Sequence, residues 1–286
     1  LRDALKDSLE AGRVYDEMLS ADPTDAEARS EAKALAREGR DVPRLLDLLK
    51  TQLEHAPDPA ARIEPLVELA DLQLARDEFG RLDALVCLEE ILQIQPGQAE
   101  ALARVEALLS DPGAGAEAAR LLVVAAERTG DTERQARALE VLAEREDDLV
   151  RATALRLRLA ACLRSLGRNA ESRKVLGDAY TETPEDPAVF ETLSEALAAD
   201  DVLEELAGLT ACGAAGLGDL PARLSVRLRA AAVLMRGGLR QPMVRLLEAN
   251  VADQEGHLPT LEMLAAVYEA LQDNARMLAT MERTAR

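Results

Sequence analysis

Apolar residues recur along this chain at intervals of three and four positions, the spacing that lines one face of an α-helix. The segments 66–74, 155–163 and 261–268 show it clearly, with Leu, Ala and Tyr at the repeated positions. No segment reads as a strand. The pattern therefore predicts a chain made of helices.

Proline and glycine interrupt these segments at short, regular intervals. Proline ends a helix because it lacks an N–H donor, and glycine supplies the left-handed cap. Between the interruptions the sequence predicts about sixteen helices, most of 10–20 residues, joined by two to six residues. No linker is long enough to separate two domains, so we expect one helical-repeat domain over residues 1–286. The interruptions are Asp22-Pro23, Gly39, Pro57–Pro59, Gly80, Pro96-Gly97, Pro112-Gly113, Gly130, Gly167, Pro184, Gly218, Gly237-Gly238 and Gly256.

Similar helix starts repeat along the sequence. The segments around Pro23 and Pro96 begin equivalent helices 96 − 23 = 73 residues apart, and a third begins at Pro184, a further 184 − 96 = 88 residues on. The extra 15 residues match one additional helix, expected at 132–146. A period near 73 fits two helical hairpins, and each hairpin needs a neighbour to cover its apolar face. Short linkers predict antiparallel packing of successive helices.

Residues 153–186 fit a 34-residue register without a gap, and 66–96 follow a similar scheme with a longer inter-helix turn around 77–80. These segments resemble the tetratricopeptide repeat family. The resemblance implies an all-α solenoid of tandem antiparallel hairpins, wound as a right-handed superhelix, whose first helices line a concave groove that receives extended peptides. The Leu-, Ala- and Arg-rich units also look like large repeat proteins of bacteria with GC-rich genomes. The matching positions are Leu159, Ala160, Leu163, Gly167, Ser172, Leu176, Ala179 and Pro184, then Leu66, Leu69, Ala70, Ala84, Leu88, Ile91 and Pro96.

The charge balance narrows the range of partners. Lys and Arg number 34 against 53 Asp and Glu, a formal charge of 34 − 53 = −19. A strongly acidic chain is a poor match for phosphate backbones or an anionic membrane surface, so we expect no nucleic-acid partner. The longest uncharged run, Leu206–Gly218, has 13 residues and is too short to span a bilayer, so we expect no membrane insertion. An aromatic content of 2% also disfavours a β-sandwich or barrel.

Residues that carry catalytic chemistry are few. Cys87, Cys162 and Cys212 form no CxxC pair and sit in apolar helical runs, so we expect three free cysteines that act as small hydrophobes, with neither a zinc site nor a disulfide framework. His55 and His257 each flank a helix end, where capping or exposure to solvent explains them. No hydrolase, metalloprotease or phosphate-loop motif is present, so we predict a protein that is not an enzyme and has no cofactor. Low cysteine usage fits a reducing cytoplasm, with the periplasm left open.

Two basic islands stand out in this acidic chain. The segment 151–174 carries seven cations against one acid, and 221–247 carries six arginines and no acid. In the repeat register Arg158 and Arg164 lie on a first helix, and Arg229 and Arg236 lie at similar places two units later. If first helices line a groove, these four arginines are positioned to bind an acidic peptide, since Arg binds carboxylates in a bidentate way. The alternative is that the arginines lie on solvated faces or pair with acids of the chain itself.

These observations favour a non-catalytic scaffold for protein–protein contact that uses the concave face of the repeat array. The alternative is a regulatory or sensor module of a larger protein whose catalytic domain lies outside this sequence. The repeat pattern predicts that the array continues past both ends of the chain, so we expect further repeats or self-association through the repeat ends.

Overall fold

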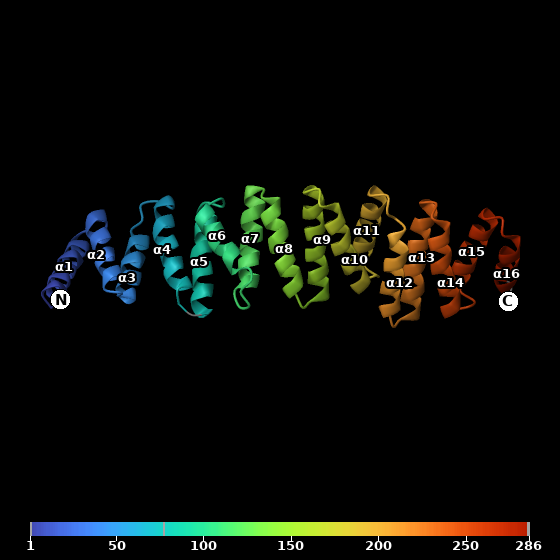
Figure 1. Cartoon of the computed structure of the whole chain (residues 1–286), viewed down its shortest axis with the longest axis horizontal. Coiled ribbons are helices and arrows are strands. Elements are labelled where there is room, and N and C mark those ends of the chain that lie inside the picture. The colour runs from blue at the N-terminus through green and yellow to red at the C-terminus, as the bar shows by residue number, and fades with distance from the viewer. Residues whose placement is uncertain (1, 77, 285–286) are drawn as a thin grey trace. The chain divides into compact units, whose positions relative to one another are not determined.

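The computed structural model describes residues 2–76 and 78–284, and the contacts between residues divide the chain into two compact units, 1–142 and 143–286. Within the described residues the chain forms sixteen α-helices of 10 to 20 residues, one 3₁₀ turn and no strand (Figure 1). The first unit holds α1 (Arg2–Ala21), α2 (Ala26–Glu38), α3 (Val42–Glu54), the 3₁₀ turn η1 (Ala60–Arg62), α4 (Ile63–Leu74), α5 (Glu78–Ile94), α6 (Ala99–Leu108), α7 (Gly115–Thr129) and most of α8 (Thr132–Arg145). The second holds α9 (Leu149–Ser165), α10 (Asn169–Glu182), α11 (Pro187–Ala199), α12 (Glu205–Gly216), α13 (Leu220–Arg236), α14 (Arg240–Asp253), α15 (Leu258–Ala270) and α16 (Asn274–Thr284).

The predicted all-α solenoid class of fold is confirmed within each unit. Successive helices pack side by side, for example α4 on α5 in the first unit and α9 on α10 in the second. The additional helix expected at 132–146 is α8. No helix in the described part of the chain is both long and apolar enough to cross a membrane. The right-handed course and the single domain over 1–286 stay predictions.

Six turns between successive helices in the described chain share one conformation. A residue with positive φ follows the helix, and the next residue donates its N–H to the carbonyl five residues back, as Asp131 does to Ala126 and Arg168 to Leu163. This bond satisfies a carbonyl that the helix end would otherwise leave open. Three of the positive-φ positions are glycines that the sequence marked as breakers, and three are not glycine. The positions are Arg40, Gly130, Gly167, Asp201, Gly238 and Gln272.

Gly80 lies inside a helix, which corrects its predicted place in an inter-helix turn. α5 begins at Glu78, and the buried Gly80 faces α4. A Cβ on Gly80 would overlap the carbonyl oxygen of Gln73. The glycine therefore permits the close approach of α4 and α5, a role that looks the same in sequence as a breaker.

The small residues of the repeat register lie in the core. Ser172 on α10 is fully buried and donates its hydroxyl to the carbonyl oxygen of Ala160 on α9, at 2.9 Å. Leu176 and Ala179 on α10 are fully buried as well. Their burial explains why small and large apolar positions alternate at fixed intervals in this segment.

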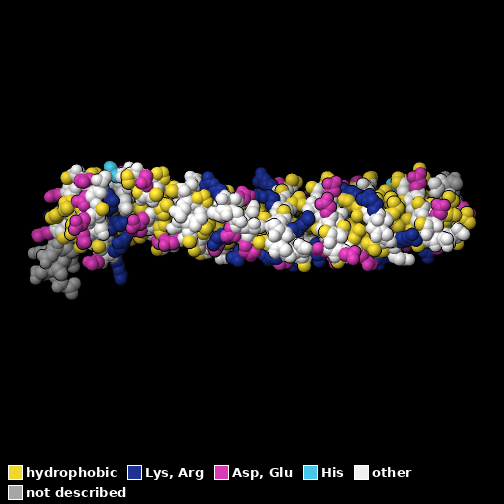
Figure 2. All heavy atoms as spheres, turned by 90° about the horizontal axis from the view of Figure 1, so that it is seen from above, with side chains coloured by type: hydrophobic (Ala, Val, Ile, Leu, Met, Phe, Trp, Pro, Cys, Tyr) yellow, Lys and Arg dark blue, Asp and Glu magenta, His cyan; other side chains and the backbone are white. Residues whose placement is uncertain are grey.

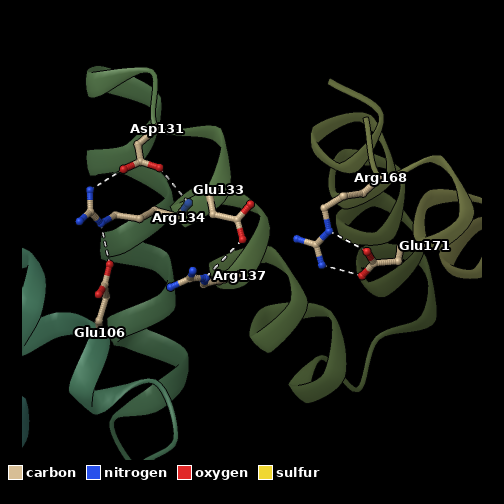
Figure 3. A network of polar contacts seen from close by, with 7 residues as sticks. All are labelled: Glu106, Asp131, Glu133, Arg134, Arg137, Arg168 and Glu171. Atoms are coloured by element: carbon tan, nitrogen blue, oxygen red, sulfur yellow. Dashed lines mark hydrogen bonds and ion pairs between the residues drawn. The ribbon is translucent and has the colours of Figure 1, made fainter. Parts of the chain in front are cut away.

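Arginine side chains link neighbouring helices through carboxylates far away in sequence. Arg104 on α6 donates to both oxygens of Asp71 on α4, at 2.6 and 2.8 Å. Arg134 on α8 donates to Glu106 of α6 at 2.6 Å and to Asp131, whose other oxygen accepts the N–H of Arg134 (Figure 3). Further long-range pairs, the first of them made by a lysine, are Lys33–Glu68, Arg44–Asp16, Arg62–Glu90, Arg81–Asp111, Arg156–Glu182, Arg173–Asp200 and Arg227–Asp253.

Charges of both signs are interspersed on the surface. On the face drawn in Figure 2, Lys and Arg atoms lie among Asp and Glu atoms without a single-sign field. In the second unit, Arg168 pairs with Glu171 across the first turn of α10 (Figure 3). Local and long-range pairs of this kind offset part of the self-repulsion expected of a chain with a charge of −19.

Candidate functional site

The histidines and the acidic residues are the candidates for a metal or reaction centre. Among the described residues, no group of three or more His, Cys, Asp or Glu side chains is placed to hold a metal ion. His55 is exposed at the end of α3, with Nδ1 2.9 Å from the Thr51 carbonyl oxygen. His257 precedes α15, with Nδ1 2.7 Å from Oγ1 of Thr260. Both lie at helix ends, as predicted.

The cysteines differ in exposure. Cys87 and Cys162 are buried, and burial together with the charges of Glu90 and Asp83 raises the pKa of the Cys87 thiol to about 11. Cys212 is exposed on α12, although it too sits in an apolar helical run. The cause is that α12 is apolar on nearly every side, so the sequence did not reveal which face packs inward.

The four arginines of the predicted peptide site lie on two helices of the second unit. Arg158 and Arg164 lie on α9, and both side chains are exposed. Arg229 and Arg236 lie on α13, where Arg236 is exposed at the last position of the helix. Within the described chain, Arg164 and Arg236 take part in no ion pair.

The Arg229 side chain packs against Pro184 and Phe190 and is only partly exposed. Its guanidinium donates to the Pro184 carbonyl oxygen at 2.5 Å and lies 4.4 Å from the centre of the Phe190 ring. The Phe190 ring lies 5.9 Å from that of Tyr180, whose hydroxyl is 3.3 Å from Oγ1 of Thr210. Arg229 thus holds α13 against the loop before α11, by a hydrogen bond and a cation–π contact.

Several other arginines of the basic islands also have partners inside the chain. Arg227 donates to Asp253 at 2.6 Å, and Arg223 lies 3.0 Å from the same carboxylate. Hydrogen bonding from Arg227, followed by the charges of both arginines, lowers the pKa of Asp253. Arg240 donates to the Ala270 carbonyl oxygen at 3.0 Å. For these residues the structure shows the intramolecular alternative.

A different surface, in the first unit, carries exposed apolar side chains. α5 and α7 lie against each other, and the groove between them has a volume of about 350 Å³. Three of its lining side chains face solvent: Leu82 is 46% exposed, Val86 66% and Val124 52%. Phe79, three residues before Leu82 on α5, is 78% exposed. We call this surface the α5–α7 groove; it is lined by Leu82, Leu85, Val86, Glu89, Leu92, Gln93, Glu117, Arg120, Leu121, Val124, Ala125 and Arg128.

The floor of the α5–α7 groove belongs to the core. Leu85, Leu92 and Ala125 are buried, which fixes both helices in place beneath the exposed side chains. Charged groups line its edges: Glu117 pairs with Arg120 at 2.6 Å, and Glu89 and Arg128 also border the groove. The groove therefore offers a rigid apolar strip bordered by charge, which suits apolar side chains of another molecule.

Sequence reasoning missed this groove, although α5 carries a signal for it. The segment 82–92 is apolar at eight positions, more than one buried face of a helix requires. Phe79, Leu82 and Val86 add a second stripe at i, i+3 and i+7 beside the buried one. A helix that is apolar on two faces predicts either burial on both sides or an exposed strip.

The second unit has a hollow at the corresponding contact between α12 and α14, with a different lining. Its volume is about 650 Å³, and Gly208, Ala211 and Ala249 leave it wide. Asp201, Glu204 and Glu205 border it, and Arg245 lies 3.9 Å from Glu204. The lining is acidic and built from small residues, so it lacks the apolar strip of the α5–α7 groove.

Comparison with known proteins yields structural neighbours only. No family model and no curated protein matches the sequence. The chain is similar to helical-repeat structures. The TPR domain of P58(IPK) matches at 11% identity over 98% of this chain and 88% of that one, with a TM-score of 0.31. The Cut9–Hcn1 heterotetramer of APC/C matches at 16% identity over 98% of this chain and 56% of that one, with a TM-score of 0.26. A human IFIT1 dimer with m7Gppp-AAAA matches at 14% identity over 90% and 68%, with a TM-score of 0.24.

Proposed function

We propose that this chain is a non-catalytic scaffold that binds another protein, with the α5–α7 groove as a contact surface. The observation that carries the proposal is the row of Leu82, Val86 and Val124, exposed side by side on two helices that share a buried floor. Exposed apolar side chains in a contiguous strip bordered by polar groups are typical of protein-binding surfaces. The cost of leaving them in water is recovered when a partner covers them.

Rigidity supports the same proposal. Helices α5 and α7 are held from below by buried leucines, and Arg62 pairs with Glu90 on the flank of α5 at 2.6 Å. A preformed surface loses little conformational entropy on binding, so few contacts are needed for useful affinity. Tandem hairpins provide such surfaces repeatedly along one chain.

The arginine site is a second and separate proposal. Arg164 and Arg236 have exposed side chains that can reach an acidic peptide, whereas Arg229 is engaged by Pro184 and Phe190. A labelled hexaglutamate peptide tests it by fluorescence anisotropy. We expect salt-sensitive binding that is lost in the Arg164→Glu, Arg236→Glu variant; no binding, or unchanged binding in that variant, would refute the site.

The scaffold proposal is tested by placing a photoreactive residue at Val86 or at Val124 in cells that make the protein. Val150 on α9 is a matched control, because it is an exposed valine outside the groove, at 79% exposure. We expect one partner to be cross-linked from both groove positions and not from Val150, with the joined peptides mapped by mass spectrometry. Equal products from all three positions, or none from the groove, would contradict a specific contact surface.

A further inference from the structure

The two helices of the α5–α7 groove present the same spacing to the space between them. The lining residues of α5 include Leu82, Val86, Glu89 and Gln93, at steps of four, three and four. Those of α7 include Glu117, Leu121, Val124 and Arg128, at the same steps. Alternating steps of three and four are the spacing by which one helix packs along another.

The two stripes run in the same direction, because the chain reverses between α5 and α6 and again between α6 and α7 (Figure 1). The middle positions of the two stripes are Val86 and Glu89 on α5, and Leu121 and Val124 on α7. Each stripe covers eleven residue steps, or about 16 Å of helix. A partner helix of about three turns matches this length, with its apolar residues over the middle of the groove.

Charges give the partner a direction. Arg128 is in the last turn of α7 and forms no ion pair or hydrogen bond within the described chain. Acidic side chains are most favourable in the first turn of a helix. An acid in the first turn of the partner meets Arg128 when the partner starts there and runs antiparallel to α5 and α7.

The α5 side of the groove has the opposite charge. Asp83 is exposed on the outer flank of α5, and Glu89 accepts only a hydrogen bond from Gln93, at 3.2 Å, among the described residues. Glu117 and Arg120 already satisfy each other on α7. Basic side chains on the flank of the partner that faces α5 would complement Asp83 and Glu89.

We infer that the α5–α7 groove binds an amphipathic helix of another protein, antiparallel to both helices, with acids in its first turn and basic residues on the side facing α5. The inference rests on the proposed scaffold function and specifies its partner. The groove follows two helices for about 16 Å, so a partner helix can lie along it and place side chains at steps of three and four over both stripes. The charge of −19 on each chain disfavours a second copy as the occupant.

Synthetic peptides test this inference with the full chain. The probe is a fluorescent 18-residue helical peptide with leucines at four-three spacing, two glutamates in the first turn and lysines along one flank. A charge-swapped peptide has the same composition, with lysines in the first turn and glutamates on the flank. A third peptide has the matched charges and a central proline that breaks the helix.

We expect the matched peptide to bind about fivefold or more tightly than the charge-swapped one, a difference that several weak surface pairs together supply. Arg128→Glu should reverse the preference, and Val86→Asp should weaken both peptides at least tenfold. The proline peptide should bind at least tenfold more weakly than the matched one. Circular dichroism of each variant checks that the helices are intact.

The results separate the helix inference from the scaffold proposal. Equal affinity for the matched and swapped peptides, or for the matched and proline peptides, would overturn the helix inference. If Val86 still cross-links a partner in cells, the scaffold proposal stands without it. A dimer of the purified chain that Val86→Asp dissociates would instead identify a second copy as the occupant and overturn the inference.

Discussion

Two pairs of next-but-one helices, α5 with α7 in the first unit and α10 with α12 in the second, differ in what fills the space between them. On α10 the buried Gly177 faces Leu209 of α12, and a Cβ on Gly177 would lie 3.3 Å from the leucine side chain. On α5 and α7 the facing positions are Val86, Leu121 and Val124, and the helices leave a groove. A glycine thus lets a neighbouring leucine fill the contact, whereas larger residues on both helices leave apolar side chains in water.

The difference shows how one packing scheme can serve both stability and binding. Helices two apart in the chain touch in both units. Between α10 and α12 the contact is completed by residues of the chain, including the Tyr180–Thr210 hydrogen bond. In the first unit the same kind of contact stays open above its floor, which leaves the surface available for another molecule.

The largest effect is expected from removing the floor of the groove. Leu85→Ala should cost about 2–4 kcal/mol of unfolding free energy, because Leu85 is buried and the cavity is not refilled. Val86→Ala, one residue away, should change it by less than about 0.5 kcal/mol, because Val86 faces solvent. Chemical denaturation of both variants measures the difference. Similar losses would mean that Val86 is covered in the folded chain.

Two glycine-to-leucine variants test whether the contact between α10 and α12 in the second unit is closed. Gly177→Leu should destabilise the protein by about 1–3 kcal/mol, because the new side chain collides with Leu209. Gly208→Leu on α12 should stabilise it by about 0.5–1 kcal/mol, because nothing lies within 4 Å of a Cβ there and leucine favours helix. Thermal unfolding followed by circular dichroism gives both signs. A stabilising Gly177→Leu would refute the close contact.

The contribution of the second unit's ion pairs to stability should be lost in acid. The folded pKa of Asp253 lies below its ordinary value of 3.8, so its contribution is present above that value and lost as the pH falls through the lowered pKa. Asp253→Asn should remove about 0.5 kcal/mol at pH 7 and less near pH 2. Denaturation at the two pH values checks this. An equal loss at both would show that the charge of Asp253 does not stabilise the fold.

The smallest perturbation is thiol labelling, which tests which helix faces are accessible to solvent. Cys212 should react quickly with a thiol reagent in the native protein, whereas Cys87 is buried and its raised pKa of about 11 keeps the thiol protonated. We expect one fast thiol, removed by Cys212→Ser, with no change in stability. Two or three fast thiols would mean that the helices open readily.

Most of the helical scaffold could be predicted from the sequence, because proline, glycine and the apolar period act locally. The exceptions have physical causes. Arg40, Asp201 and Gln272 adopt the left-handed turn without glycine, and Gly80 permits close packing inside a helix. The sequence around a left-handed residue that is not glycine looks like any other loop, and a glycine used for close packing looks like a helix breaker. A local pattern therefore cannot tell these cases apart.

The sites were harder to predict than the scaffold. The segment 221–247 contains no acid, yet Arg223 and Arg227 pair with Asp253, which lies just beyond it and one helix away. An excess of cations in a short segment of the sequence therefore did not mean an excess of unpaired cations in the folded protein. The α5–α7 groove depends on which faces of two helices meet, and the two apolar stripes of α5 alone did not say which stripe is covered.

The most direct measurement compares the alkylation rates of cysteines placed at Val86 and at Leu209 in the Cys212→Ser background. Val86 lies on the open contact and Leu209 on the closed one. We predict that the cysteine at position 86 reacts at least tenfold faster in the purified chain than the one at 209. Equal rates, or a protected position 86, would contradict an open apolar groove between α5 and α7.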